Sequence, residues 1–345
     1  MSVRTRDSIR MRDIAADLGV SVNTVSRVLR NQGRISVKVR KRILDRAKEL
    51  NYRPDLTARS LATGRTFLIG MIVPDLMHPF FAAIAKVLAR NLRQKGYSLV
   101  LSSSDEDPEL ELQEIEALLA RRIDTLVLAS SQRAKSNSIS RCLHEAHVPH
   151  LLLDRPLRGL NSHFVGSNNE AIGELATEHL IERGYRRIAH IGIPNLPPGR
   201  GRLAGYKATL KRHGHIVNPD YVIAVESGDE RGEECGYAAL HKLLMLKSRP
   251  DAVFCYNDVI AAGAQRAVLE AGLAIPGEMA LIGVSNLAGL SCWNTLYVPL
   301  STIDQDVPGL AAEATQQILE LQDARVKAVP KRTFVPLKLV IREST

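Results

Sequence analysis

The chain has 345 residues, of which 45% are hydrophobic and 24% charged, a composition typical of a globular protein with two or three domains. No apolar run approaches the roughly 18 residues that a membrane span needs, and the N-terminal segment lacks the apolar stretch of a secretory signal. These features argue against a membrane protein and predict a cytoplasmic location. The four cysteines, Cys142, Cys235, Cys255 and Cys292, form no C-x-x-C pair and are expected to be reduced thiols.

The net charge of +9 is unevenly distributed. Residues 1–66 hold 16 of the 46 Lys and Arg residues but only 6 of the 37 acidic residues, so this segment carries the whole excess of positive charge. The remainder of the chain is close to neutral. A basic module joined to a neutral one predicts a polyanionic partner at the N-terminus and a different role for the rest of the chain.

The basic segment has the pattern of three short helices. Apolar residues at helical spacing predict helices over 11–18, 22–29 and 37–50. Gly19 ends the first helix and permits a tight turn, while Ser21 and Ser36 are suited to cap the second and third. Two short helices joined by a glycine-containing turn are a helix-turn-helix, the motif that places its second helix in the DNA major groove.

The second helix leaves five side chains facing outward, namely Val22, Asn23, Thr24, Ser26 and Arg27. In a major groove, asparagine can pair with adenine, arginine can pair with guanine, and an apolar group can contact a thymine methyl. Thr24, Ser26 and Arg34 are suited to phosphate oxygens, which position a protein on DNA without specifying sequence. A solvated three-helix cap is the alternative, and the charge asymmetry disfavours it.

The run RDIAADLGVSVNTVSRVL over 12–29, with the later segments ELNYRP and ARSL, resembles the head of the lactose/galactose repressor family of bacterial regulators. The resemblance implies that Val22 and Asn23 set base preference and that Arg27 is a further DNA contact. Arg30 stands where the family commonly has asparagine.

The segment 55–65 connects the head to the remainder. Pro54 is expected to end the third helix before it, and the run Ala58–Ala62 is too short for a stable helix alone in water. One interpretation is a flexible linker. The resemblance implies instead a hinge helix that folds on operator DNA and inserts Leu61 into the minor groove, which kinks the duplex.

From Phe67 the sequence alternates apolar runs with amphipathic stretches. Strands are predicted at 67–73, 98–103, 125–130, 150–154, 187–193, 252–256 and 280–284, with a last one in the C-terminal KLVIREST. Helices are predicted at 79–95, 109–121, 170–183, 202–213, 234–246 and 259–271. This alternation predicts parallel sheets covered on both faces, with ligand beyond the carboxyl ends of the strands.

The same pattern resembles the periplasmic sugar-binding fold, which the repressor family shares. The predicted fold is therefore a small all-α head over 8–54, a hinge helix over 55–65, and a two-lobed α/β domain with two parallel sheets over 66–345. By resemblance, lobe one comprises 66–165 and 297–326. Lobe two comprises 166–296 and 327–345.

The resemblance also implies an effector site in the cleft between the lobes. The residues carried over are His78, Phe81, Asp154, Arg155, Arg202, Asn257 and Gln305. Phe81 would cover the apolar face of a sugar ring, and Asp154 with Arg155 would bind paired hydroxyls. Asp258 is expected to cap the helix that follows it.

Two cleft positions depart from the family pattern. Ser285 stands where an aspartate is expected, and Glu230 stands where an aromatic residue is usual. One hypothesis is that His78, Arg155 and Arg202 then favour an anionic effector, such as a sugar acid or sugar phosphate.

The sequence has no phosphate-binding loop, nucleophile elbow or metal-ligand spacing above background, so we expect no catalytic residue, metal or cofactor. The predicted function is a transcription regulator, specifically a repressor, that binds a palindromic operator as a homodimer and responds to a sugar-like effector. A periplasmic-type solute-binding protein and an enzyme fused to a DNA-binding head are the alternatives.

Overall fold

The computed structural model describes residues 9–29, 33–52, 60–61, 63–133, 136–157, 159–226, 232–290, 298–323 and 329–345. The chain divides into two compact units, Met1–Thr66 and Phe67–Thr345. Among the described residues, no helix combines the length and the hydropathy that crossing a bilayer would take.

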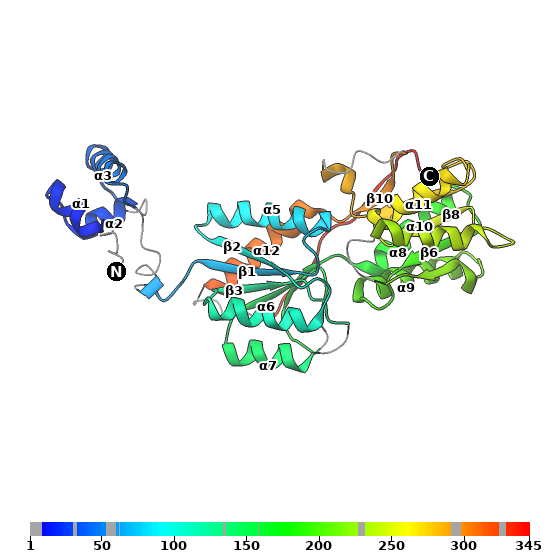
Figure 1. Cartoon of the computed structure of the whole chain (residues 1–345), viewed down its shortest axis with the longest axis horizontal. Coiled ribbons are helices and arrows are strands. Elements are labelled where there is room, and N and C mark those ends of the chain that lie inside the picture. Colours follow the sequence, from blue (N-terminus) through cyan, green and yellow to red (C-terminus); the bar gives the residue numbers. More distant parts are fainter. Residues whose placement is uncertain are drawn as a thin grey trace, which may run out of the picture. The chain divides into compact units, whose positions relative to one another are not determined.

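The N-terminal unit contains the three predicted helices (Figure 1), α1 (Met11–Leu18), α2 (Val22–Leu29) and α3 (Val37–Glu49). Their apolar faces form one small core, which consists of Ile14, Ala15, Val25, Val28, Ile43 and Ala47. Gly19 ends α1 with a left-handed backbone, φ 63°. Ser21 accepts a hydrogen bond from the Thr24 amide and Ser36 accepts one from Val39, so both predicted caps are confirmed.

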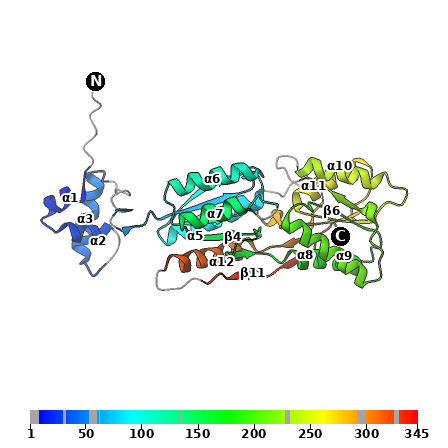
Figure 2. The same cartoon turned by 90° about the horizontal axis from the view of Figure 1, so that it is seen from below.

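Lobe one of the second unit is a six-stranded parallel sheet in the order β11-β5-β4-β3-β1-β2. Its strands are β1 (Leu68–Val73), β2 (Ser98–Ser103), β3 (Thr125–Leu128), β4 (His150–Leu153), β5 (His163–Gly166) and β11 (Arg332–Phe334). Helices α5 (Pro79–Gln94) and α12 (Val307–Gln322) cover one face, and α6 (Pro108–Ala120) and α7 (Asn137–Ala146) cover the other (Figures 1 and 2). Both faces are therefore buried, as in a doubly wound fold.

Lobe two repeats this plan with the order β12-β10-β9-β8-β6-β7. Its strands are β6 (Ile188–Gly192), β7 (Val222–Ala224), β8 (Ala252–Cys255), β9 (Ala280–Val284), β10 (Ser301–Asp304) and the antiparallel edge strand β12 (Lys338–Val340). Helices α8 (Asn169–Glu182) and α9 (Pro197–Arg212) cover one face, and α10 (Gly232–Leu244) and α11 (Asp258–Glu270) cover the other. Short 3-10 helices η1 (Pro219–Tyr221) and η3 (Leu287–Leu290) complete the lobe.

Within the described residues, the chain crosses between the lobes after β5, β10 and β11. The first crossing lies where the sequence predicted it, but the predicted second and third crossings, at 296/297 and 326/327, are wrong. β10 pairs with β9 and belongs to lobe two, while β11 pairs with β5 and belongs to lobe one. Strands of three or four residues at these places are too short to show a periodic pattern.

Other predicted elements also differ from the structure. β5, β7, β10 and β11 have three or four residues and were not predicted, and neither were the helices α7 and α12. Helix α9 begins at Pro197 rather than at 202, because a proline at the first turn of a helix loses no hydrogen bond.

Helices α8 and α9 approach each other through a pair of glycines. A Cβ at Gly173 would lie 2.1 Å from the Arg202 carbonyl oxygen, and one at Gly205 would lie 2.0 Å from the Glu170 carbonyl oxygen. The two backbones therefore lie too close for any side chain at these positions. This contact sets the position of Arg202, which is carried on α9.

The core of lobe two contains a buried histidine whose protonation opposes folding. His190 stacks between Tyr206 and Phe254, with ring centroids 5.4 Å and 4.6 Å away, and its Nδ1 donates to the Phe254 carbonyl at 2.9 Å. Burial lowers the pKa of His190 to about 4. An unfolded histidine has a pKa of about 6.5, so between these values the unfolded state binds the additional proton.

We expect His190 to make the protein less stable as pH falls from about 6.5 to about 4, by up to about 3 kcal/mol. His190→Phe keeps the stacked ring and does not titrate. Urea titrations across this pH range should therefore show that the free energy of unfolding falls more steeply with decreasing pH in the wild type than in the variant. Parallel losses in both proteins would contradict the prediction.

We expect Gly173→Ala to destabilise the domain by about 1–3 kcal/mol, because the added methyl forces α8 and α9 apart. The loss should occur although alanine favours a helix over glycine by about 1 kcal/mol. Gly277→Ala is the control, since the nearest atom to its Cβ would be Ala274 Cβ at 3.5 Å. Equal free energies of unfolding for the two variants, from denaturant titration, would refute the close approach.

Candidate effector cleft and DNA-reading surface

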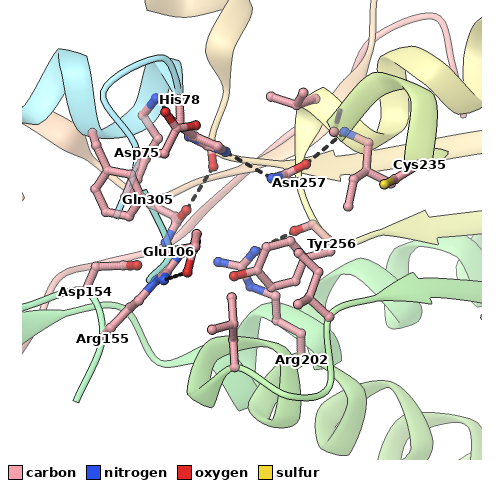
Figure 3. A pocket seen from close by; sticks show the side chains of 18 of the residues that line it. Asp75, His78, Glu106, Asp154, Arg155, Arg202, Cys235, Tyr256, Asn257 and Gln305 are labelled. Atoms are coloured by element: carbon pink, nitrogen blue, oxygen red, sulfur yellow. Dashed lines mark hydrogen bonds and ion pairs between the residues drawn. The ribbon is translucent and has the colours of Figure 1, made fainter. Parts of the chain in front are cut away.

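A cleft in the second unit is lined by residues of both lobes (Figure 3). Eight of the predicted effector residues line it, namely His78, Phe81, Asp154, Arg155, Arg202, Asn257, Ser285 and Gln305. The ninth, Glu230, lies outside the described residues. The sequence thus predicted residues that the fold brings together from distant parts of the chain.

Most of these side chains follow the carboxyl ends of strands. His78 comes shortly after β1, Asp154 and Arg155 follow β4, and Asn257 follows β8. Ser285 and Gln305 directly follow β9 and β10 in the same way. Parallel strands direct their carboxyl ends to one edge of a sheet, so residues from both sheets converge on the cleft.

His78 and Asn257 join the two lobes across the cleft. Asn257 Oδ1 accepts a hydrogen bond from the Ile260 amide at 2.8 Å, which turns its Nδ2 towards His78 Nε2 at 3.0 Å. His78 Nδ1 lies 3.3 Å from the Phe80 amide. Both neighbours of the ring are N–H donors, and a neutral imidazole has one acceptor nitrogen, so each tautomer can satisfy only one of these contacts. Burial and the nearby arginines lower the pKa of His78 to about 4, which keeps the ring neutral.

Asp154 and Arg155 each present a polar atom without a partner among the described residues. Asp154 Oδ1 and Arg155 Nε are both buried and make no hydrogen bond. Asp154 has a left-handed backbone, φ 60°, and burial raises the pKa of its carboxyl group. A buried polar atom without a partner is costly, and a ligand in the cleft could satisfy both.

Arg155 is held by Glu106. Its two terminal nitrogens donate to the two carboxylate oxygens at 2.8 Å and 2.6 Å, and its guanidinium lies 5.5 Å from the centre of the Phe81 ring. Burial alone would lower the pKa of Arg155, but the hydrogen bonds and charge of Glu106 outweigh burial and leave it raised.

Arg202 is fixed by lobe two. Nε donates to Asn169 Oδ1 at 3.0 Å, Nη1 donates to the Tyr256 carbonyl, and the guanidinium lies 4.4 Å from the centre of the Tyr256 ring. Arg202 is 3% exposed. The arginine is therefore held in place by contacts within its own lobe.

Ser285 is tied to the crossings between the lobes. Its hydroxyl donates to Gln305 Oε1 at 3.1 Å, and Gln305 Nε2 donates to Ser167 Oγ at 3.1 Å. Ser167 lies at the first crossing and Gln305 at the second. The serine that replaces the expected aspartate thus orients Gln305, and Gln305 links two of the connections between the lobes.

The predicted cap of α11 by Asp258 is wrong, since Asn257 caps this helix. Asp258 instead accepts hydrogen bonds from the Leu287 amide at 2.8 Å and from Thr302 Oγ1 at 2.7 Å. Burial raises the pKa of Asp258 to about 7. The side chain therefore connects α11 to η3 and β10 rather than to its own backbone.

Several lining residues were not among the predicted site residues, notably Asp75, Glu106, Cys235 and Tyr256. Glu106 lies shortly after β2, as the predicted residues lie shortly after their strands. It could therefore have been predicted from the principle that ligands bind beyond the carboxyl ends of parallel strands. Tyr256 precedes Asn257 and is another such case. Cys235 lies on α10, and no sequence pattern marked it.

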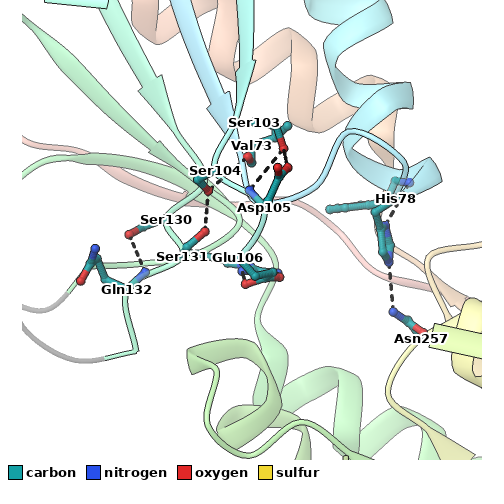
Figure 4. Close-up of polar contacts among 12 residues, drawn as sticks. Val73, His78, Ser103, Ser104, Asp105, Glu106, Ser130, Ser131, Gln132 and Asn257 are labelled. Atoms are coloured by element: carbon teal, nitrogen blue, oxygen red, sulfur yellow. Dashed lines mark hydrogen bonds and ion pairs between the residues drawn. The ribbon is translucent and has the colours of Figure 1, made fainter. Parts of the chain in front are cut away.

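Beside Glu106, serines at the ends of β2 and β3 form a buried network (Figure 4). Ser104 and Ser131 share a hydrogen bond of 2.6 Å, and both are fully buried. Glu111 accepts from the Ser130 hydroxyl at 2.8 Å and from the Ser131 amide. This network fixes the loops that follow the two strands, one of which carries Glu106.

The residues predicted to read DNA lie in the N-terminal head, and most of them are exposed. Val22, Asn23, Arg27 and Arg34 are exposed, and Thr24 and Ser26 are half-buried. Thr24 Oγ1 lies 2.8 Å from the capping hydroxyl of Ser21, so the Thr24 hydroxyl already has one hydrogen-bond partner within the head. Leu61 is helical and 78% exposed, while residues 55–59 and 62 of the hinge segment lie outside the described residues, as does Arg30. The roles of these residues in DNA binding stay predictions.

Two family models match the chain. Residues 10–55 match the bacterial regulatory proteins of the lacI family, and residues 66–342 match the periplasmic binding proteins and sugar binding domain of the LacI family. A ribose operon repressor of Halalkalibacterium halodurans is 32% identical over 341 residues, which cover 97% of this chain and 96% of the relative. The repressor PurR of Haemophilus influenzae is 32% identical over 339 residues, which cover 97% and 98% of the two chains.

Solved structures agree with these matches. A lac repressor dimer bound to operator and the anti-inducer ONPF is similar with a TM-score of 0.82 at 27% identity, covering 98% of this chain and 99% of that chain. A complex of the transcriptional regulator CelR with cellobiose is similar with a TM-score of 0.72 at 25% identity, covering 98% and 100%. The chain belongs to the LacI family of bacterial DNA-binding transcription regulators, with a helix-turn-helix head and a ligand-binding domain of the periplasmic-binding-protein type.

Proposed function

We propose that this regulator is a repressor that binds a palindromic operator as a homodimer in the cytoplasm and changes its operator affinity when a sugar-like effector occupies the cleft. The observation that carries the effector proposal is the pair of buried atoms without partners, Asp154 Oδ1 and Arg155 Nε, in a cleft between two lobes. The basic helix-turn-helix head disfavours the alternative of a solute-binding protein. No catalytic role is proposed for any residue of the cleft.

Operator recognition would depend on α2 and on the hinge segment. Asn23 and Arg27 are the exposed side chains of α2 with donors suited to base edges. Leu61 is an exposed apolar side chain, as a wedge for the minor groove requires. Two heads related by a two-fold axis would read two half-sites, so the operator would have the same symmetry.

We expect Arg27→Ala to reduce the preference for operator over random DNA by about tenfold or more, because a base contact carries about 1–3 kcal/mol of discrimination. The operator is first selected from randomised duplexes, and affinities are then measured by fluorescence anisotropy at fixed salt. Arg12 on α1, whose side chain is 68% exposed, supplies the control. Arg12→Ala should leave the ratio of the two affinities unchanged. An unchanged ratio in Arg27→Ala would remove Arg27 from the base contacts.

The effector is proposed to be a small polyhydroxylated ligand. Hydroxyl groups both donate and accept, so one ligand can donate to Asp154 Oδ1, accept from Arg155 Nε, and supply the contact that His78 lacks in either tautomer. Phe81 and Tyr256 add aromatic surface to the lining. Since relatives are named as ribose operon repressor and PurR, ribose and purines belong in the first set of ligands tested.

We expect one sugar of a panel of pentoses, hexoses and disaccharides to raise the melting temperature, because a ligand that binds only the native state stabilises it. The same sugar should change operator affinity. Asp154→Asn should weaken its binding about tenfold or more, and Asp220→Asn, at an exposed position on η1, should leave binding unchanged. Stabilisation by purines alone would replace the sugar by a base as the proposed effector.

A further inference from the structure

We propose that Glu106 is a specificity-determining residue, which holds both terminal nitrogens of Arg155 and thereby restricts the cleft to uncharged polyhydroxylated ligands. This inference rests on the proposed function, since it concerns the ligand of the same cleft. It also reverses the hypothesis, drawn from sequence, that the arginines favour an anionic effector.

The first step is the geometry of the Glu106–Arg155 pair. The contacts of 2.8 Å and 2.6 Å join both terminal nitrogens of the guanidinium to both carboxylate oxygens. The two side chains are 6% and 9% exposed. Arginine binds a carboxylate or phosphate best through such a two-pronged contact, and here Glu106 already occupies that position. Glu106 thus pairs the charge of Arg155 and takes two of its five N–H donors, and Nε has no partner among the described residues.

The second step is that the backbone holds Glu106 in this place. Its amide donates to the Pro74 carbonyl at 2.8 Å, which ties its loop to the loop that carries Asp75 and His78. On its other side, Asp107 caps α6 by accepting from the Glu109 amide at 2.7 Å. Glu106 is thus fixed between a cross-loop hydrogen bond and a helix cap, and the carboxylate is positioned before any ligand binds.

The third step concerns the second arginine. Two nitrogens of Arg202 are engaged within lobe two, Nε by Asn169 and Nη1 by the Tyr256 carbonyl. The described lining further includes the carboxylates Asp75, Asp154 and Glu226. Four acidic residues therefore face two arginines among the described lining residues, and His78 adds no charge. An anionic ligand would enter a cleft with an excess of negative charge among the described lining residues, in which the charge of Arg155 is already paired with Glu106, and this disfavours such a ligand.

The test reads the charge of the cleft with a thiol that already lines it. Cys235 lies in the lining and is in no disulfide (Figure 3). Its rates of reaction with a cationic and an anionic methanethiosulfonate of similar size can be compared by peptide mass spectrometry. Access to the thiol affects both rates equally and cancels in their ratio. The ratio therefore reports the electrostatic potential at the thiol. Cys142 on α7, also in no disulfide, is a reference within the same molecule.

In the wild type we expect the cation-to-anion rate ratio at Cys235 to exceed that of glutathione. Glu106→Gln should lower the ratio about tenfold, because Arg155 then lacks its counter-charge. Glu226→Gln makes the same change of charge at an exposed position and should have a smaller effect. The double variant Glu106→Gln/Arg155→Gln removes both charges of the pair and should restore the wild-type ratio. The ratio at Cys142 should stay constant throughout.

A wild-type Cys235 that reacts faster with the anion would overturn the proposal, and so would an equal effect of Glu226→Gln and Glu106→Gln. If Glu106→Gln does not fold, as judged by thermal unfolding, Arg155→Gln gives the opposite test. It leaves Glu106 without its partner and should raise the ratio about tenfold; an unchanged ratio would again overturn the proposal.

A separate ligand experiment keeps this inference distinct from the proposed function. The sugar that stabilises the wild type is compared with its own aldonic or uronic acid by calorimetry. We expect the acid to bind the wild type at least about tenfold more weakly and this gap to narrow in Glu106→Gln. An acid that binds the wild type as tightly as the sugar would overturn the specificity of Glu106. If no sugar binds, the proposed function fails, and the thiol ratio still decides the role of Glu106.

Discussion

The cleft depends on one constraint, which is that two parallel sheets direct the carboxyl ends of their strands towards each other. Residues that follow β1, β2 and β4 in lobe one therefore meet residues that follow β8 and β9 in lobe two. The segments that cross between the lobes hold the strand ends of the two sheets opposite each other. Gln305 contributes to this arrangement, since it forms hydrogen bonds with Ser285 after β9 and with Ser167 at the first crossing. Because the side chains are placed by strand ends, the lining can change chemically while the fold is kept.

Burial gives the charges of this cleft their effect. In water, the attraction between an arginine and a glutamate would be weak, but Arg155 and Glu106 are both nearly buried. Such a pair contributes little net stability, whereas removing one partner leaves an uncompensated buried charge. The pair is therefore better understood as a constraint on what can bind than as a support for the fold. Asp154 adds a second constraint on the ligand. One of its carboxylate oxygens has no partner among the described residues, and only a hydrogen-bond donor can satisfy it.

The sequence predicted the head almost completely, because its three helices are local, periodic and capped by Ser21 and Ser36. It predicted the long central strands for the same reason, since β1, β8 and β9 are continuous apolar runs. It failed on β10 and β11, whose assignment depends on pairing partners far away in the chain. The residues that line the cleft could be predicted from the family resemblance and from their positions after strands. The hydrogen-bond partners of these residues could not be predicted in this way. No sequence pattern shows that Glu106 reaches Arg155, because 49 residues separate them.

The partnerships at Asn257 and Asp258 suggest how a ligand could act beyond the cleft. Asn257 lines the cleft and contacts His78 in the opposite lobe, while the adjacent Asp258 binds the Leu287 amide. Leu287 belongs to lobe two by its chain, yet its side chain is part of the apolar core of lobe one. A ligand that shifts Asn257 therefore acts on a residue joined directly to the contact between the lobes. Coupling of this kind needs no long pathway, since two consecutive residues at the start of α11 serve both the ligand site and the interface.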